Sequence, residues 1–137
     1  MNSEDLIRKL ELVPHPEGGH YRETWRDRRE DGSRGHGTAI YFLLQSGERS
    51  RRHRVDAAEI WHHYAGAPLE LLIEKERLVL GPELLEGQRP QHIVPPGAWQ
   101  SARSLGDWTL VGCTVSPAFE FEHFELDPTD TGEEAPR

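Results

Sequence analysis

Short strand-like segments recur along this chain and leave little room for helices. The clearest is TAIYFLLQ at Thr38 to Gln45, which is rich in β-branched and aromatic residues. Turn residues such as Gly81-Pro82 and Gly106-Asp107 separate the segments. Further strands are predicted at residues 52–55, 58–64, 69–74, 78–80, 91–94, 100–104, 109–116 and 119–126. Many short strands at near-regular spacing are typical of an antiparallel sandwich or barrel, so we predict an all-β fold.

The N-terminal part predicts one helix and one further strand. Ser3 can cap a short amphipathic helix over residues 3–11, and the prolines that follow would end it. HYRETWR at His20 to Arg26 alternates like a strand with one polar face, and residues 27–37 form a charged, exposed and mobile loop. A length of 137 residues suits one domain, which we place at residues 1–126. Residues 127–137 lack an apolar anchor, so a disordered tail is expected there.

The net charge and the cysteine content indicate which binding partners and which cellular compartment to expect. A formal net charge of −8 argues against nucleic acid and anionic membranes, which both require a cationic surface. The single cysteine, Cys113, lies in an apolar strand, excludes an intrachain disulfide and fits a reducing compartment. No apolar run approaches the roughly 20 residues that span a bilayer. We therefore expect a cytoplasmic protein whose main partner is a small molecule.

Strand alternation predicts which polar side chains meet inside the barrel. If His53 points inward, Val55 does so too, and Glu59 brings Trp61 and His63 with it. Gln100 is expected to face the same interior from another strand. The predicted cavity thus has a few convergent polar groups and apolar walls, as small-molecule sites do.

Two functional interpretations of His53 and Glu59 stay open, beside simple ligand binding. In one, Glu59 orients the imidazole, and His53 acts as a general base or acid near neutral pH. In the other, His53, Glu59 and Gln100 hold a first-row divalent ion. We assign no metal ligand and no cofactor, and keep the divalent metal as the alternative.

Tyr41 and Arg22 complete the set of candidates. Tyr41 could serve as a phenolic proton donor, or could form part of the wall with its hydroxyl bonded to a neighbour. Arg22 lies on an early strand, where it could hold a phosphate or carboxylate of the ligand or form a surface ion pair. We thus predict His53, Glu59 and Tyr41 as catalytic groups, with ligand contacts from His63, Gln100, Trp61 and Arg22.

The segment Gly47 to Gly66 resembles the first signature of the cupin superfamily, in which a glycine, two histidines, a glutamate and a glycine follow a fixed spacing. Gly47, His53, Glu59 and Gly66 match it, whereas Val55 stands at the second histidine. In the second signature the P-x-G is present at Pro95 and Gly97, but Gln100 replaces the histidine and Ser104 the asparagine. Val55 has no lone pair to offer a metal, so the resemblance implies a weakened metal site.

The whole chain is more closely similar to the small cupins of the DUF985 (Cupin_5) type. Five motifs carry this similarity: LVPHPEGGHYRETW, TAIYFLL, HRVDAAEIWHHYAG, QHIVPPGAWQSAR and LVGCTVSPAFEFEHFEL. The resemblance implies a jelly-roll barrel, a homodimer, and a pocket likened to those of sugar-nucleotide epimerases.

The predicted function is therefore a small-molecule-binding cupin that acts as an isomerase or epimerase on a sugar-like or other carbonyl substrate. The alternatives are a metal-dependent oxygenase or isomerase that uses the degraded ligand set, and a cupin that binds its ligand without converting it.

Overall fold

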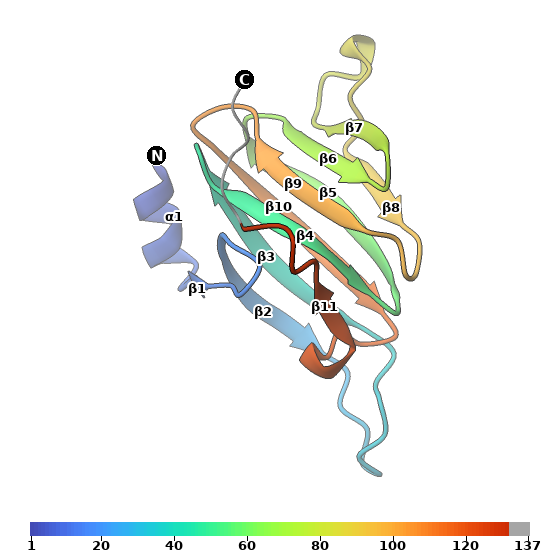
Figure 1. Cartoon of the computed structure of the whole chain (residues 1–137). Helices are drawn as coiled ribbons and strands as arrows, with labels where there is room; N and C mark the ends of the chain where they lie inside the picture. Colours follow the sequence, from blue (N-terminus) through green and yellow to red (C-terminus); the bar gives the residue numbers. More distant parts are fainter. Residues whose placement is uncertain (132–137) are drawn as a thin grey trace.

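Two antiparallel β-sheets face each other in a computed structural model that describes residues 1–131 (Figure 1). The six-stranded sheet has the order β1 (Val13–Pro14), β2 (His20–Arg26), β3 (Thr38–Gln45), β10 (Trp108–Ser116), β5 (Ala58–Gly66) and β8 (Gln91–Val94). The five-stranded sheet has the order β11 (Phe124–Leu126), β4 (Arg49–Val55), β9 (Gln100–Ser104), β6 (Leu69–Ile73) and β7 (Glu76–Leu80). Two 3₁₀ turns, η1 (Leu84–Glu86) and η2 (Phe121–His123), complete the elements together with helix α1 (Ser3–Lys9). The predicted all-β cupin jelly roll with a short N-terminal helix is confirmed.

Helix α1 covers the outside of the six-stranded sheet rather than its inner face. The predicted cap was wrong by one residue, because the side chain of Asn2, not of Ser3, accepts a hydrogen bond from the Asp5 amide at 2.9 Å. The Asp5 carboxylate in turn accepts from the Asn2 amide, which completes a capping box. Leu6 packs with Leu43 of β3 in a small outer cluster. None of the helices in the described part of the chain has the length and apolar character that a membrane crossing requires.

The main core fills the space between the two sheets. Alternation along β3 sends Phe42 and Leu44 inward while Leu43 faces α1. β5 and β10 of the same sheet add the buried Trp61 and Val111, and the facing sheet adds Leu69, Leu71 and Leu80. Cys113 is free and buried in the same core. This core occupies one part of the barrel interior and leaves the other part to polar groups.

The segments outside the strands are tied down more firmly than the sequence suggests. In the loop predicted to be mobile, Arg34 makes a two-pronged ion pair with Asp56, with N–O distances of 2.9 and 2.8 Å. The strand predicted at residues 119–126 is instead η2 followed by the short strand β11. Asp127 and Asp130, in the predicted tail, hydrogen-bond to β4, and residues 132–137 of that tail lie outside the described residues.

Candidate functional site

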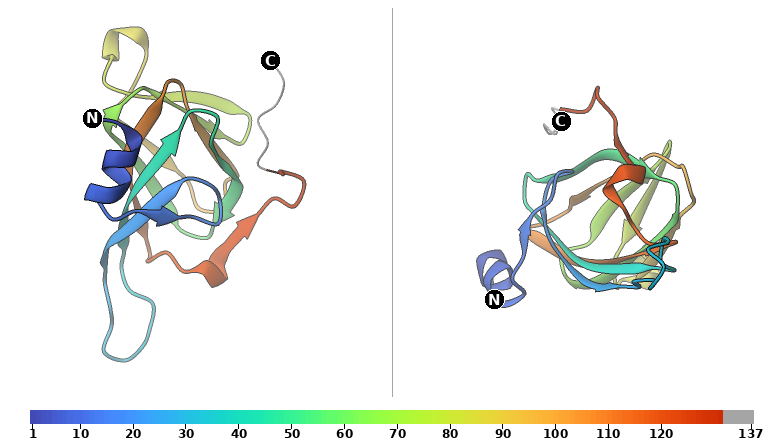
Figure 2. Two further views of the ribbon diagram at one scale, coloured as in Figure 1. Left: turned by 90° about the vertical axis from the view of Figure 1, so that its left-hand side faces the viewer. Right: turned by 90° about the horizontal axis from the view of Figure 1, so that it is seen from below.

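A cavity of about 50 Å³ lies between the sheets, near the edge where β2, β4 and the C-terminal segment approach one another. Such a volume holds a few ordered waters or a small organic group. Its polar and aromatic lining includes His15, Glu17, Tyr21, His53, Glu59 and Cys113. Helix α1 is on the opposite side of the barrel from the C-terminal segment, as the two views of Figure 2 show.

His53 projects from β4 into this cavity and is only 2% exposed. Its Nδ1 atom lies 2.7 Å from the carbonyl oxygen of Arg51, and a carbonyl can only accept, so Nδ1 carries the proton. The Nε2 atom then holds a lone pair and has no hydrogen-bond partner among the described residues. Burial lowers the pKa of His53, although Glu59 and the Arg51 carbonyl oppose this shift. The imidazole is thus a neutral base held in one tautomer.

Glu59 projects from β5 and is fixed by a chain of two hydrogen bonds. Its Oε1 accepts from the Gln100 amide nitrogen at 2.9 Å, and the Gln100 Oε1 accepts from the Trp61 indole at 2.8 Å. The indole can only donate, so it orients the Gln100 amide with its NH₂ group toward Glu59. Burial raises the pKa of Glu59 to about 7, against the opposing effect of His53. Glu59 can therefore exchange a proton close to neutral pH.

Glu17 is a central group of the site, and it was not among the predicted residues. It lies in the turn between β1 and β2, and its carbonyl accepts from the Arg51 amide at 2.6 Å. Its Oε2 lies 3.3 Å from His53 Nδ1 and accepts a hydrogen bond from the Ser50 hydroxyl. Burial raises the pKa of Glu17 to about 8, with Ser50 opposing. Glu17 is therefore protonated at neutral pH.

His15 closes the polar cluster on the same turn. Its Nδ1 accepts a hydrogen bond from the Glu17 amide at 3.0 Å, so in the neutral ring the proton is on Nε2. The ring packs edge-on against Tyr21 with centroids 4.4 Å apart. Burial, and to a smaller extent His53, lowers the pKa of His15 to about 3. His15 stays neutral over the physiological range and can act as a hydrogen-bond donor or a wall, not as a cation.

Four of the seven predicted site residues come together, and three do not. His53, Glu59, Gln100 and Trp61 are buried side by side as the alternation predicts. Tyr41 faces outward, beside the outer cluster under α1, because its neighbour Phe42 takes the inward position. The ring centroids of Tyr41 and Tyr64 lie 6.3 Å apart. The placement of Tyr41 in the cavity was thus wrong.

Arg22 and His63 also lie away from the cavity. Arg22 is 49% exposed and pairs with Glu11 at 3.3 Å, as a surface ion pair. His63 lies beyond Trp61 toward the other end of β5, where its Nε2 atom is 3.1 Å from the Ala67 carbonyl. A register shift opposite Leu110 and Val111 interrupts the regular alternation there. Neither side chain can contact a ligand that sits against His53.

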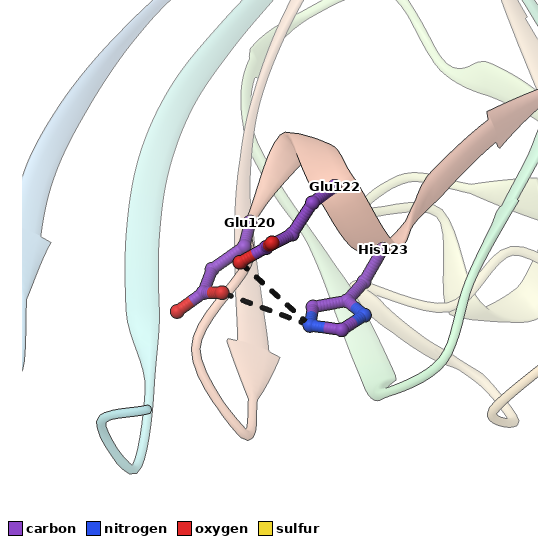
Figure 3. Close-up of side chains that lie close together, drawn as sticks. All are labelled: Glu120, Glu122 and His123. Atoms are coloured by element: carbon purple, nitrogen blue, oxygen red, sulfur yellow. Dashed lines mark ion pairs between the residues drawn. The ribbon is translucent and has the colours of Figure 1, made fainter. Parts of the chain in front are cut away.

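The donors of the cavity do not fit a metal site of the kind that the cupin signatures describe. Val55 has no donor atom, and the carbonyl oxygen of Gln100 is already bonded to the Trp61 indole. Over residues 1–131, three metal-competent donors converge only at Glu120, Glu122 and His123, on the surface at η2 (Figure 3). There His123 is also 3.4 Å from Asp56. We therefore derive no metal-dependent step for the cavity.

Comparisons with known proteins agree with this architecture. Protein SO0799 from Shewanella oneidensis is 42% identical, with a TM-score of 0.88 over 93% of this chain and 85% of that one. A hypothetical protein from Leishmania major is 32% identical, with a TM-score of 0.83 over 93% of this chain and 88% of that one. A cupin 2 conserved barrel domain protein from Rhodopseudomonas palustris, 15% identical over 86% of this chain and 77% of that one, shares the fold at a TM-score of 0.64. No curated protein matches the chain. The model of the Cupin superfamily (DUF985) family covers residues 4–127, and the chain belongs to that family.

Proposed function

We propose that the cavity binds a small carbonyl compound, such as a sugar-like molecule, and that the protein is a metal-free isomerase or epimerase. One observation supports this proposal above the others. The lone pair of His53 Nε2 is in a buried cavity that also holds two carboxyl groups with pKa values near neutrality. Proton transfer next to a carbonyl needs a base and an acid that can both work at neutral pH.

The first chemical step in this proposal is removal of a proton from the carbon next to the substrate carbonyl. His53 Nε2 takes the proton, and the electron pair of the broken C–H bond forms a carbon–carbon double bond. Glu17, which is protonated at neutral pH, donates its proton to the carbonyl oxygen, so that an enol forms. Burial disfavours the imidazolium that His53 becomes, and the nearby Glu59 carboxylate stabilises it.

The second step returns a proton to carbon. The imidazolium of His53 delivers it to the enol, or first passes it to the Glu59 carboxylate on β5 of the facing sheet, which then delivers it. The Glu17 carboxylate takes a proton back from oxygen, so that every group returns to its starting state. Delivery to the opposite face of the same carbon gives an epimer. Delivery to the former carbonyl carbon gives an isomer when the neighbouring carbon carries a hydroxyl, whose proton Glu17 then takes as the new carbonyl forms. The Trp61 to Gln100 hydrogen bond holds Glu59 in position throughout.

Deuterium exchange tests this function even when the product is unidentified. The protein is incubated in D₂O with a panel of aldoses, ketoses and 2-oxo acids, and NMR follows the loss of each C–H signal next to a carbonyl. We expect exchange on at least one compound, and a decrease of about 10²- to 10⁴-fold in His53→Gln, as for loss of a general base. His63→Gln is the matched control and should exchange like the wild type, because His63 lies outside the cavity.

Equal exchange by His53→Gln and the wild type would contradict the proposal. Elemental and native mass spectrometry of the natively purified protein add a second criterion. One tightly bound metal per chain, lost in His53→Gln, would replace the metal-free reaction with the metal-dependent alternative. A co-purified polar organic molecule would instead support the proposal and identify the ligand class.

A further inference from the structure

The C-terminal segment, residues 117–131, forms one wall of the cavity, and we call it the strap. Its first residues are fixed to the β2–β3 side of the barrel. The Arg26 guanidinium donates to the Phe119 carbonyl at 2.8 Å, and the Arg34 guanidinium donates to the Ala118 carbonyl at 2.8 Å. The Phe119 amide also donates to the Thr38 hydroxyl at 3.1 Å. This end of the strap can therefore stay fixed while the rest of the strap moves.

The middle of the strap lies directly against the groups that we assign to the chemistry. Phe119 and Phe121 line the cavity. The ring centroid of Phe124 lies 5.4 Å from that of His53, and the centroid of Phe121 lies 5.9 Å from that of His15. The aromatic side chains of the strap thus cover one side of the imidazoles, and moving them away would enlarge the opening to His53.

The far end of the strap is held to a single strand. β11 pairs with β4 only, through Phe124, Glu125 and Leu126. Beyond it, Asp130 is the best-anchored residue. The Arg49 guanidinium donates to both Asp130 carboxylate oxygens, at 3.1 and 2.9 Å, and the Arg52 amide donates at 2.7 Å. Arg51 donates to the Asp130 main-chain carbonyl at 2.7 Å.

Asp130 differs from the other ion pairs of the strap in its burial. Its side chain is 11% exposed, whereas the Arg54 to Glu125 pair is about half exposed on both partners. Exposed pairs contribute little, and two-pronged arginine–carboxylate pairs in partly buried places contribute more. Among the ion pairs of the strap, the pair of Asp130 should therefore stabilise the closed position most, and its loss should favour opening most.

We propose that the strap is a gate: it swings away from β4 to open the cavity, and Asp130 is the latch that keeps it closed. The far end of the strap is held by one short strand pairing, by contacts between Asp127 and Arg52, and by one buried ion pair. A segment held in this way opens at a lower free energy than the whole fold. Entry of a substrate through this gate rests on the proposed function. The opening of the strap does not rest on it.

The chain carries its own reporter of this opening. Cys113 is the only cysteine of the sequence, is fully buried and lines the same cavity. Burial raises its pKa well above the usual value, and the thiolate is the reactive form, so the closed state protects it. Opening of the strap brings solvent and reagent to the thiol while the rest of the barrel stays folded.

Labelling with methyl methanethiosulfonate, followed by intact-mass measurement under native conditions, tests the gate. Asp130→Asn should raise the labelling rate of Cys113 about tenfold, which corresponds to loss of about 1.4 kcal/mol of closure free energy. Glu70→Gln is the matched control. Its side chain is 12% exposed and is also held by two arginines, Arg77 and Arg103, but on β6, away from the strap.

Equal acceleration in Asp130→Asn and Glu70→Gln would mean that labelling follows global unfolding, and would overturn the proposal, as would no acceleration in Asp130→Asn. Hydrogen exchange of the wild type gives a result that does not depend on any variant. The strap amides that bond to β4 should exchange at least tenfold faster than those of β10, and equal rates would overturn the proposal. Neither experiment uses a substrate, so a failure here leaves the proposed function standing, and the reverse also holds.

Discussion

Glu17 and Glu59 have no lysine or arginine ion-pair partner among the described residues, although both are buried. Burial raises the pKa of Glu17 from 4.5 to about 8, so the folded state binds a proton that the unfolded state releases above pH 4.5. Stability is therefore lost as the pH rises from about 4.5 to about 8. His15 acts in the opposite sense, because its pKa of about 3 costs stability as the pH falls below 6.5.

The substitution Glu17→Gln should remove the Glu17 part of this pH dependence. Between pH 5 and pH 8 the wild type should lose stability relative to Glu17→Gln, by at most about 1.4 kcal/mol per pH unit. Urea unfolding of both proteins at pH 5, 6.5 and 8 measures the difference. A difference that stays constant with pH would mean that Glu17 titrates normally, and that it is not the acid of the proposed reaction.

Strand periodicity explains which site residues could be predicted. His53, Glu59, Trp61 and Gln100 all lie on strands, where alternation determines the inward face. Glu17 and His15 are in a turn, which has no periodicity. Their only signal is the sequence PHPEGGH, in which charged and titratable residues stand between prolines and glycines that bend the chain back on itself.

Among the structural elements, the turn between β1 and β2 depends most on Gly18. Gly18 has a φ of +109°, and a Cβ there would overlap the Arg49 carbonyl oxygen. Only glycine lets the turn approach β4 closely enough for the Glu17 carbonyl to accept from the Arg51 amide. The turn therefore brings Glu17 to the cavity.

Gly18→Ala should destabilise the protein by roughly 2 to 5 kcal/mol, because the strained φ and the overlap add. Gly47→Ala is the control, since Gly47 also has a positive φ, +79°, but open space around its Cβ position. Its cost should be only about 1 to 2 kcal/mol. Urea denaturation compares the two, and equal costs would show that the turn can move away from β4.

At the level of elements, the bounds of regular strands were predicted well and the irregular positions were not. β3, β8 and β9 have the predicted bounds. The regular face predicted for β2 is interrupted by a register shift between Glu23 and Trp25, which turns the exposed Trp25 outward and brings Arg26 to the cavity. Such bulges depend on tertiary pairing and leave no mark in the alternation itself.

At the scale of the whole molecule, the residues that the structure describes form an apolar groove on an outer face. This groove, on the outside of the six-stranded sheet, is lined by Trp25, Ala39, Ile60 and Thr114, and His36 is the one acidic or basic residue in its lining. Exposed Ile93 extends it as the cross-strand partner of Ile60. In a chain of net charge −8, such a face is where a second copy can approach with least repulsion. We propose that it forms the interface of a homodimer.

Ile60→Glu should shift the protein to the monomer, because it places two like charges in a symmetric interface. Leu85→Glu is the control, since Leu85 is fully exposed on η1, apart from this face. Sedimentation equilibrium gives the mass of each variant. A monomeric wild type, or a dimer that survives Ile60→Glu, would rule out this interface.

The contacts of Asp130 with Arg49 and Arg52 make the chain just after Asp130 a poor place for attachments. An affinity tag, a fluorescent fusion or a solid support fixed there would disturb the Asp130 latch and change the rate at which ligands enter the cavity. A compound library screened on such a preparation would measure binding to a protein in which the strap is partly displaced from β4. Attachment beside α1, whose contacts are with the outside of the sheet, leaves the cavity undisturbed.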